Sequence, residues 1–179
     1  MKKVKVKIRG IVPLLQNRFV GEEEETASER IGVIERSEEW KQALYFDEKI
    51  GVYEPSEHIW GAMIKAAGNF QIPGRGKKTY KDLIKSGIII EPDKIPFGKR
   101  EPDGIDKRPV VVRGSRILRQ RPMMKDGWEL SFTINILEEQ LPVEAVKKIL
   151  EYAGRCVGIG DFRPRFGRFE VEEFKEEKE

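Results

Sequence analysis

The sequence predicts an α+β domain in which two helices cover one face of an antiparallel sheet and leave the other face free. Two observations support this fold. Several short segments alternate polar and apolar residues or are continuously apolar, as strands do, and two longer segments space their apolar residues as helices do. The order along the chain is strand, helix, strand, strand, helix, strand. The 179 residues suffice to bury one core, so we expect a single domain over residues 1–174 with insertions.

The first expected strand lies at the amino terminus, where Val4, Val6 and Ile8 alternate with lysines and Arg9. A period of two with β-branched residues is typical of a half-buried strand, and Pro13 should end it.

An insertion is expected over about residues 14–54. Residues 16–37 are polar and acidic and indicate a loop, which a short helix near residues 39–44 follows. Residues 44–53 predict a small hairpin with its turn at residues 47–51.

The first core helix should begin at Ser56, whose hydroxyl can cap it, and end near Gly68. Its apolar face contains Ile59, Met63 and Ala66. The small residues at positions 61 and 62 allow close packing.

A second insertion is expected over about residues 71–108. It begins with a basic glycine- and proline-containing loop at residues 71–78 and a short helix at residues 80–85 that stops at Gly87. The run Ile88-Ile89-Ile90 indicates a buried strand. Residues 92–107 are rich in turn formers and predict an exposed excursion.

The next two strands are expected to form a long hairpin. Residues 109–118 have strand character, Asp126-Gly127 is a turn signal, and the apolar residues at every second position from Trp128 to Ile136 predict the second arm.

The last expected helix begins near Pro142, buries a stripe that includes Val146 and Leu150, and stops at Gly154. A strand over residues 168–174 and an acidic tail at residues 175–179 follow. The complete order is that of the ferredoxin-like, RRM-like βαββαβ core with loop and hairpin insertions, whose free sheet face is a surface for RNA in RNA-recognition domains.

Composition restricts the classes of site. The abundance of glutamate, lysine and arginine resembles that of proteins from thermophiles. Cys156 and His58 are the only residues of their types, which excludes an intrachain disulfide and a Cys/His zinc site, and no metal or cofactor is expected. The amino terminus has no apolar signal segment and no apolar run could span a membrane, so we expect a cytoplasmic protein.

Residues 154–169 carry the main functional signal because four glycines, four arginines and three phenylalanines alternate there. Arginine donors match phosphate, phenylalanine rings can stack on unpaired bases, and glycine permits close approach. The expected partner is RNA or single-stranded DNA. The phosphate contacts would come from Arg155, Arg163, Arg165 and Arg168, and the stacking from Phe162 and Phe166. The alternative is that the glycines only turn the chain and the phenylalanines are core.

Further basic residues could extend this positive track although the net charge is only +3. They are Arg113, Arg116, Arg119 and Arg121, together with Lys77 and Lys78. The alternative for residues 113–121 is an exposed strand face that pairs with acidic segments such as residues 22–25 and 35–39.

Two motifs resemble those of a known family. Residues 50–67, with Pro55, Ser56 and then Gly61-Ala62, resemble the entry to the first helix of RAMP-superfamily proteins, especially the backbone subunits of CRISPR effector complexes. Residues 158–169 resemble the glycine-rich loop before the last strand of that superfamily. Uncharacterised phage and mobile-element proteins share both motifs. The resemblance implies a ferredoxin-like fold and an RNA ligand. It implies nucleic-acid backbone contacts for Gly158, Gly160, Arg163, Arg165, Gly167 and Arg168.

Three functions are compatible with these patterns. The first is non-catalytic binding of RNA or single-stranded nucleic acid. The second is metal-independent RNA cleavage with His58 as general base and Tyr53 or Lys65 as helper, against the alternative that His58 is an ordinary residue of the first helical turn. The third is a structural module that joins a homo-oligomer or a nucleoprotein complex through contacts between acidic and basic segments.

Overall fold

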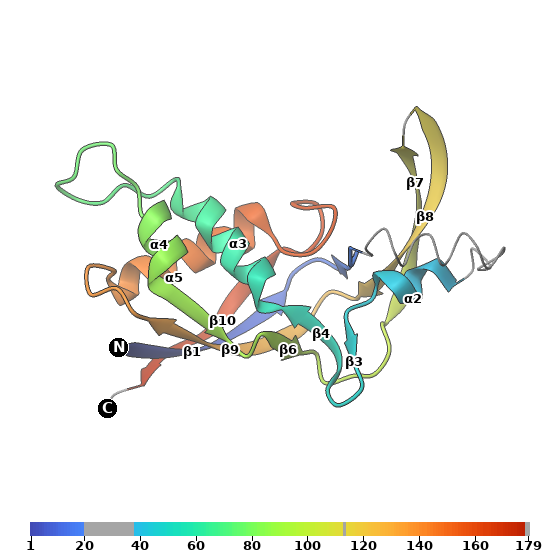
Figure 1. Ribbon diagram of the computed structural model, residues 1–179, viewed down its shortest axis with the longest axis horizontal. Coiled ribbons are helices and arrows are strands. Elements are labelled where there is room, and N and C mark those ends of the chain that lie inside the picture. The colour runs from blue at the N-terminus through green and yellow to red at the C-terminus, as the bar shows by residue number, and fades with distance from the viewer. Residues whose placement is uncertain (20–37, 113, 178–179) are drawn as a thin grey trace.

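Four antiparallel strands form the central sheet of the computed structural model, in the order β10-β1-β9-β5 (Figure 1). The strands are β1 (Lys2–Gly10), β5 (Ile88–Glu91), β9 (Glu129–Ile136) and β10 (Phe169–Glu177). The structure describes residues 1–19, 38–112 and 114–177. These strands confirm the predicted α+β class with an antiparallel sheet.

Three helices lie on one face of this sheet: α3 (Ser56–Ala67), α4 (Lys81–Gly87) and α5 (Val143–Tyr152) (Figure 1). The alternation predicted for β1 is confirmed, because Val4, Val6 and Ile8 are buried while Lys3 and Lys5 are exposed. The buried strand residues pack with helix residues such as Ile59 and Leu150 in one core. Helices α3 and α5 correspond to the two helices expected from the sequence.

The long hairpin predicted for residues 109–118 and 128–136 is wrong. β9 pairs with β5 on one side and with β1 on the other, so the short isoleucine run supplies the neighbouring strand. Ile88 and Ile90 are buried, whereas Val111 and Leu118 are 68% and 58% exposed. Burial of apolar surface therefore favours the short run. The single strand expected over residues 109–118 is also wrong, because residues 109–112 and 115–118 belong to two paired strands outside the central sheet.

A different hairpin rises from the body of the protein (Figure 1). It consists of β7 (Gly104–Val112) and β8 (Ser115–Met124), and β8 also pairs with β2 (Leu14–Leu15). The exposed excursion expected at residues 92–107 is thus wrong in part, because β6 (Lys94–Pro96) and the start of β7 lie there. Aspartate, glycine and proline in this region suggested turns, but cross-strand pairing fixes the backbone.

The first insertion contains the short helix and the small hairpin that the sequence predicts. They are α2 (Glu39–Ala43) and the pair β3 (Phe46–Asp47) and β4 (Gly51–Pro55), and β4 also pairs with β6. The loop expected at residues 16–37 lies mostly outside the described residues.

Three element ends differ from the prediction. Ser56 is the first residue of α3 and makes no capping hydrogen bond, because Pro55 occupies the position before the helix. Gly154 does not end α5, since a π-helical turn (Ala153–Val157) continues to Gly158, where φ is +73°. β10 continues through Glu177, three residues into the expected tail, because it pairs with β1 over its whole length.

No helix within the described ranges is long and apolar enough to cross a membrane.

Candidate nucleic-acid interface

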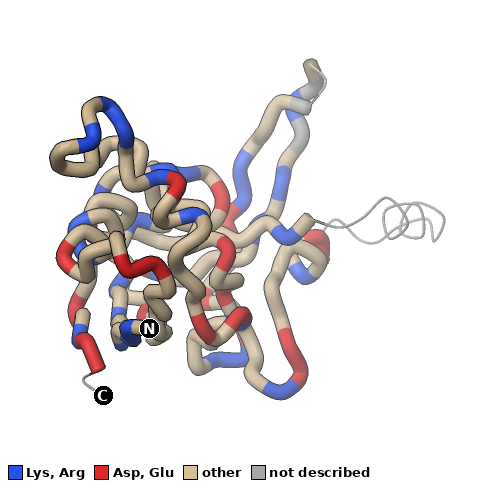
Figure 2. The backbone as a smooth tube through the Cα atoms, turned by 60° about the vertical axis from the view of Figure 1, so that its left-hand side comes forward, with Lys and Arg blue, Asp and Glu red and all other residues tan. Residues whose placement is uncertain are grey.

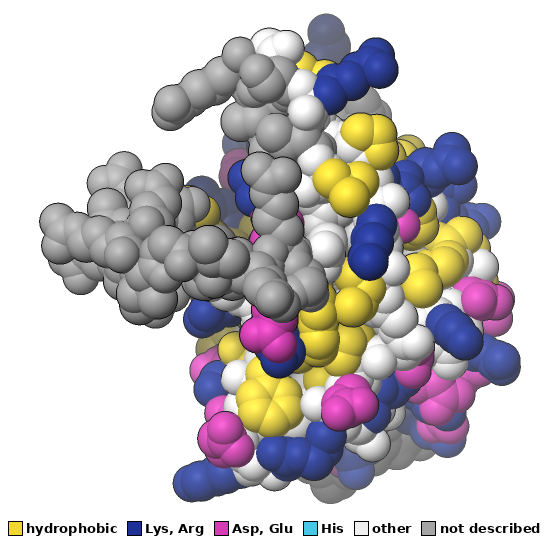
Figure 3. All heavy atoms as spheres, turned by 90° about the vertical axis from the view of Figure 1, so that its right-hand side faces the viewer, with side chains coloured by type: hydrophobic (Ala, Val, Ile, Leu, Met, Phe, Trp, Pro, Cys, Tyr) yellow, Lys and Arg dark blue, Asp and Glu magenta, His cyan; other side chains and the backbone are white. Residues whose placement is uncertain are grey.

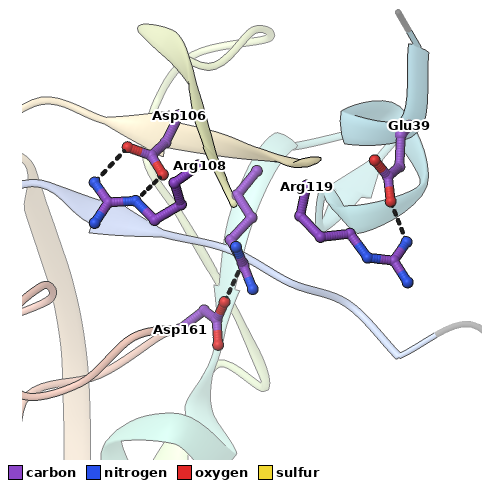
Figure 4. A network of polar contacts seen from close by, with 6 residues as sticks. Glu39, Asp106, Arg108, Arg119 and Asp161 are labelled. Atoms are coloured by element: carbon purple, nitrogen blue, oxygen red, sulfur yellow. Dashed lines mark hydrogen bonds and ion pairs between the residues drawn. The ribbon is translucent and has the colours of Figure 1, made fainter. Parts of the chain in front are cut away.

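The hairpin β7–β8 presents two different faces because side chains alternate along each strand. The register places Asp106 opposite Arg121 and Arg108 opposite Arg119, so these four residues share one face. We call this the inner face, because its side chains contact α2 and the loop before β10 (Figure 4). The outer face carries Ile105, Lys107, Pro109, Val111, Arg116 and Leu118.

The loop of residues 158–168, which we call the glycine-arginine loop, packs closely against its own chain. Its amides at Asp161 and Gly167 donate to the carbonyls of Leu15 and Pro13, at 2.8 Å each. A Cβ atom on Gly160 would lie 2.5 Å from the Leu15 carbonyl oxygen, and one on Gly167 would lie 1.7 Å from that of Ile159. These glycines therefore serve the close packing of the loop.

Burial separates the glycines from the side chains in this loop. Gly158 and Gly167 are buried and Gly160 is half-buried, whereas Phe162, Arg163 and Arg165 are exposed. The loop thus presents Phe162, Arg163 and Arg165 to solvent, while the backbone of its glycines faces the protein. Contacts between nucleic acid and the backbone at Gly158 and Gly167, which the family resemblance implies, remain a prediction.

Arg108 joins the hairpin to the loop by stacking on two aromatic rings. Its guanidinium carbon lies 4.7 Å from the ring centroid of Phe166 and 5.1 Å from that of Phe162. The two rings are 6.0 Å apart and tilted by 66°. Such cation–π contacts hold the guanidinium against the rings. Phe166 is only 9% exposed, whereas Phe162 is 44% exposed and keeps surface for a ligand.

Asp106 fixes the orientation of Arg108. Its carboxylate accepts two hydrogen bonds, from Nε at 2.6 Å and from Nη2 at 2.8 Å. This hydrogen bonding raises the pKa of Arg108 above its ordinary value, and burial opposes the rise. The guanidinium is therefore a permanent cation held between a carboxylate and two rings.

Two further arginines of the inner face pair with carboxylates. Arg121 contacts Asp161 of the glycine-arginine loop, and Arg119 contacts Glu39 of α2 (Figure 4). Glu39 belongs to one of the acidic segments in the sequence. Arg119 therefore pairs with an acidic segment of its own chain, as the second interpretation of residues 113–121 predicts. Both arginines fasten the hairpin to neighbouring elements.

Four predicted arginines have no hydrogen-bond or ion-pair partner among the residues that the structure describes. Arg155, Arg163 and Arg165 are exposed near the end of α5 and on the loop, and Arg116 is exposed on the outer face of the hairpin. Such cations are available to bind phosphate. Arg168 is half-buried, and its Nε atom has no hydrogen-bond partner within the described part of the chain. Arg113 lies outside the described residues.

Lys77 and Lys78 lie on a projecting loop closed by the bridge between Gln71 and Thr79. This loop and the hairpin are at opposite ends of the molecule (Figures 1 and 2). The structure therefore does not bring the two lysines next to the glycine-arginine loop, and the predicted single track divides into two surfaces.

The free face of the central sheet is covered with ion pairs. Lys5 Nζ lies 2.5 Å from Glu177 Oε1, and Lys7 Nζ lies 3.1 Å from Glu129 and 3.3 Å from Glu172. Hydrogen bonds to Glu129 and Glu172 raise the pKa of Lys7. The aromatic residues described in these strands pack toward the helices, so this face offers no ring for base stacking. The expectation of an RNA-recognition surface here gains no support.

His58 contacts a buried carboxylate that the sequence reading missed. Its Nδ1 atom lies 2.5 Å from Oε1 of Glu54, which is fully buried, and Oε2 of Glu54 accepts a hydrogen bond from Gln16 at 2.8 Å. The Tyr45 ring meets His58 edge-on at 5.4 Å, and burial raises the pKa of Tyr45. Neither helper expected from the sequence, Tyr53 nor Lys65, has a described contact with His58.

Sequence reasoning also missed Asp106, Arg108 and Asp161 as parts of the interface. The alternation of Ile105 and Lys107 with Asp106 and Arg108 could have extended the strand to include them. Arg108 stacks on Phe162 and Phe166, and Asp161 pairs with Arg121. These contacts join segments that are distant in sequence, so no local pattern predicts them. No cluster of three or more histidine, cysteine, aspartate or glutamate residues in the described part of the chain could hold a metal ion.

Comparison with known proteins gives a structural match only. No protein-family model and no curated protein match the sequence. A chain in the cryo-EM structure of the Type III-B Cmr-beta bound to cognate target RNA matches with a TM-score of 0.66 and 11% sequence identity. The match covers 99% of this chain and 61% of that chain, so this protein spans about three fifths of its length. The likeness shows a fold shared with a chain of this Cmr-beta structure, in line with the family resemblance that the two sequence motifs indicate.

Proposed function

We propose that this protein binds RNA without cleaving it, through the glycine-arginine loop and the hairpin β7–β8. One observation carries the proposal. Arg163 and Arg165 are exposed and have no partner among the described residues, and they belong to the same loop as Phe162, whose side chain is 44% exposed. Cations beside an accessible ring suit a single strand, whose phosphates and unstacked bases are both exposed.

The topology supports assigning the core to the ferredoxin-like fold. The elements β1, α3, β5, β9, α5 and β10 follow the order βαββαβ, and β1 lies between β9 and β10 in the sheet. The structural match to a chain of an RNA-bound Cmr-beta supports RNA over DNA as the partner.

The outer face of the hairpin supplies a second part of the surface. Ile105, Val111 and Leu118 are 36%, 68% and 58% exposed, and Lys107 and Arg116 lie among them. Hydrophobic side chains interspersed with basic ones mark this side of the molecule (Figure 3). Apolar side chains can wedge between unstacked bases while neighbouring cations contact phosphates.

Fluorescence anisotropy with labelled single-stranded RNA, single-stranded DNA and duplex DNA tests this proposal at two salt concentrations. We expect the protein to prefer single-stranded RNA. The double substitution Arg163→Ala and Arg165→Ala should weaken binding about tenfold to a hundredfold and lower the salt dependence, because two phosphate contacts are lost.

Lys77→Ala with Lys78→Ala is the matched control, because it also removes two exposed cations but from the distant loop. Its effect on RNA affinity should be several times smaller. Equal losses in the two double variants would show that only overall charge matters. No binding to any nucleic acid at low salt would reject the proposal.

The pair of His58 and Glu54 favours a second candidate function, metal-independent RNA cleavage. A buried carboxylate that contacts Nδ1 orients the imidazole and leaves Nε2, which has no described partner, to act as a general base. His58 is 30% exposed, so a substrate 2′-hydroxyl could reach it.

Incubation of labelled RNA with the protein in EDTA, followed by gel electrophoresis, tests this candidate. If cleavage occurs, His58→Ala should abolish it and leave RNA affinity unchanged, and Glu54→Gln should slow it. Intact RNA after prolonged incubation with the wild type, or full cleavage by His58→Ala, would exclude His58 as the base.

A further inference from the structure

A loop over residues 71–81 follows α3, ends at the first residue of α4 and projects from the layer of helices (Figure 1). We call it the basic loop, because it holds four cations and no acidic residue. All four are exposed (Figure 2): Arg75, Lys77, Lys78 and Lys81. The loop and the hairpin β7–β8 lie at opposite ends of the molecule, so these charges form a surface of their own.

The charges of the basic loop are not neutralised within the described part of the chain. Arg75 Nη2 donates a hydrogen bond to Gln140 Oε1, which is neutral. The three lysines have no hydrogen-bond or ion-pair partner among the described residues. The carboxylates nearest to these groups in sequence, Asp82 and Glu139, are exposed and form no ion pair with the loop. The loop is therefore a concentrated positive charge that can attract an anionic ligand.

Hydrogen bonds across the basic loop hold its backbone in one conformation. The Ile72 amide donates to the Lys78 carbonyl at 2.8 Å, and the Tyr80 amide donates to that of Phe70 at 3.0 Å. The Tyr80 side chain is buried in the core, and the Phe70 ring meets that of Tyr152 edge-on at 5.5 Å. Because both ends of the loop are anchored, a ligand meets cations whose backbone positions are already fixed, and binding costs less conformational entropy.

Two glycines leave the backbone in the middle of the basic loop open to a ligand. Gly74 and Gly76 are exposed with φ of +75° and +63°, and a Cβ atom on either would meet nothing within 4 Å. They therefore turn the chain without packing against it, unlike Gly160 and Gly167 of the glycine-arginine loop. The amides of Gly74, Gly76 and Lys77 have no hydrogen-bond partner among the described residues. Exposed amides beside cations are suitable donors to phosphate oxygens.

The side chains of the basic loop favour a ligand that is recognised by its charge alone. The loop exposes no large hydrophobic side chain, because Ile72 is half-buried and Tyr80 is buried. It therefore has no ring on which an unpaired base could stack, and no apolar centre of the kind that protein interfaces bury. Cations and amides without stacking groups fit a phosphodiester backbone whose bases are already paired with each other.

We propose that the basic loop binds the phosphodiester backbone of a nucleic-acid double helix. Lys77, Lys78 and Lys81 contact phosphates, and the amides near Gly76 approach the same backbone. A double helix suits the loop better than a single strand does, because its phosphates lie closer together along the axis and each contact releases more counterions. The site goes beyond the single-strand surface proposed above and does not depend on it.

Fluorescence anisotropy at about 0.05 M and 0.2 M salt tests the site with two labelled probes. One is a blunt duplex RNA of about 16 base pairs, and the other is an unstructured single-stranded RNA of about 8 nucleotides. Lys77→Ala with Lys78→Ala should weaken duplex binding about tenfold and reduce the magnitude of the slope of log K against log salt by about 2, because two phosphate contacts are lost. The same variant should weaken binding of the short single strand less than about threefold.

Two double variants serve as controls. Lys2→Ala with Lys3→Ala removes two exposed cations that have no ion-pair partner among the described residues, and it should bind the duplex as the wild type does. Arg163→Ala with Arg165→Ala should lose affinity mainly for the single strand. Failure of the duplex result therefore contradicts the role of the basic loop alone, and failure of the single-strand result contradicts that of the glycine-arginine loop alone. Circular dichroism melting of each variant verifies that it folds.

Duplex DNA and an RNA–DNA hybrid identify the kind of helix. Equal affinity for all three duplexes assigns the loop to the phosphate backbone of any double helix, and unequal affinities assign it to the geometry of the helix that binds most tightly.

Three results would overturn the proposal. The first is that the wild type binds no duplex at low salt. The second is that Lys77→Ala with Lys78→Ala binds the RNA duplex as tightly as the wild type does, or loses as much affinity for the single strand as for the duplex. The third is that Lys2→Ala with Lys3→Ala loses as much duplex affinity as the variant of the basic loop. An acidic protein surface would then be the partner to test.

Discussion

Gly167 and Gly74 have the same backbone angle in very different surroundings. Both have a φ of +75°, a conformation that L-residues with a side chain rarely adopt. A Cβ atom on Gly167 would lie 1.7 Å from the carbonyl oxygen of Ile159, whereas one on Gly74 would meet nothing within 4 Å. Substitution of these two glycines therefore separates two contributions to the loss of stability: the strain of the backbone angle and the steric clash of an added Cβ atom.

We therefore expect Gly167→Ala to lower the free energy of unfolding by about 3 kcal/mol or more, since strain and a steric clash combine. Gly74→Ala should cost only about 1–2 kcal/mol because strain acts alone. Urea unfolding followed by circular dichroism measures both values. Similar losses in the two variants would mean that the glycine-arginine loop relaxes around the added methyl group.

Phe162 and Phe166 show what a local pattern cannot predict. The sequence offers two alternatives, that the phenylalanines stack on bases or that they belong to the core, and the structure buries one ring and exposes the other. Phe166 is 9% exposed and Phe162 is 44% exposed. The surroundings of both rings depend on residues distant in sequence, because Arg108 stacks on them and the backbone of their loop bonds to Pro13 and Leu15.

At the scale of elements, Asp103 fastens the base of the hairpin β7–β8. Its carboxylate accepts hydrogen bonds from Lys99 Nζ at 2.8 and 3.0 Å and from the backbone amide of Lys125 at 2.9 Å. Burial by itself would raise the pKa of Asp103, but the hydrogen bonds outweigh it and the pKa lies below the ordinary value of 3.8. The ionised form is therefore stabilised in the folded protein.

This shift predicts a pH dependence of stability. Because the pKa of Asp103 is lower in the folded protein, its contribution is present above pH 3.8 and is lost as the pH falls through the folded pKa. Asp103→Asn should lower the free energy of unfolding by about 1–2 kcal/mol at neutral pH.

Thermal unfolding of the wild type and Asp103→Asn, followed across pH 7 to 3, measures this contribution. The difference between the two proteins should shrink toward the acid end, since the aspartate becomes protonated. A difference that stays constant over the whole range would assign the effect to the shape of the side chain rather than to its charge.

The sequence correctly predicted the elements in which the spacing of apolar residues defines a single face for burial. β1 and β9 alternate strictly, and α3 and α5 carry apolar stripes, so each has one face that must be buried. Residues 88–91 and 109–118 both have strand character, and no local feature shows which one pairs with β9. The answer depends on packing against α3 and α4, which brings residues distant in sequence together.

At the scale of the whole molecule, the hairpin and the chain termini lie at opposite ends of the long axis (Figure 1). The outer face of the hairpin exposes Val111 and Leu118 beside Arg116. The end of β10, which lies near the amino terminus, exposes carboxylates such as that of Glu176. An exposed apolar patch with basic neighbours at one end and acidic residues at the other suits head-to-tail contact between copies.

We therefore expect nuclease-treated protein to associate at low salt, as a structural module of an assembly would. Size-exclusion chromatography with light scattering should give multiples of 20.7 kDa at about 0.05 M salt and the monomer mass at about 0.5 M, because salt screens contacts between charges. Arg116→Glu places a negative charge on the outer face of the hairpin and should shift the low-salt mass toward the monomer. Lys78→Glu makes the same change of charge on the distant loop and should leave the mass unchanged. If both variants dissociate equally, overall charge rather than the hairpin drives association. A mass of 20.7 kDa at every salt and protein concentration would reject self-assembly. RNA or another protein would then be the partner of the outer face.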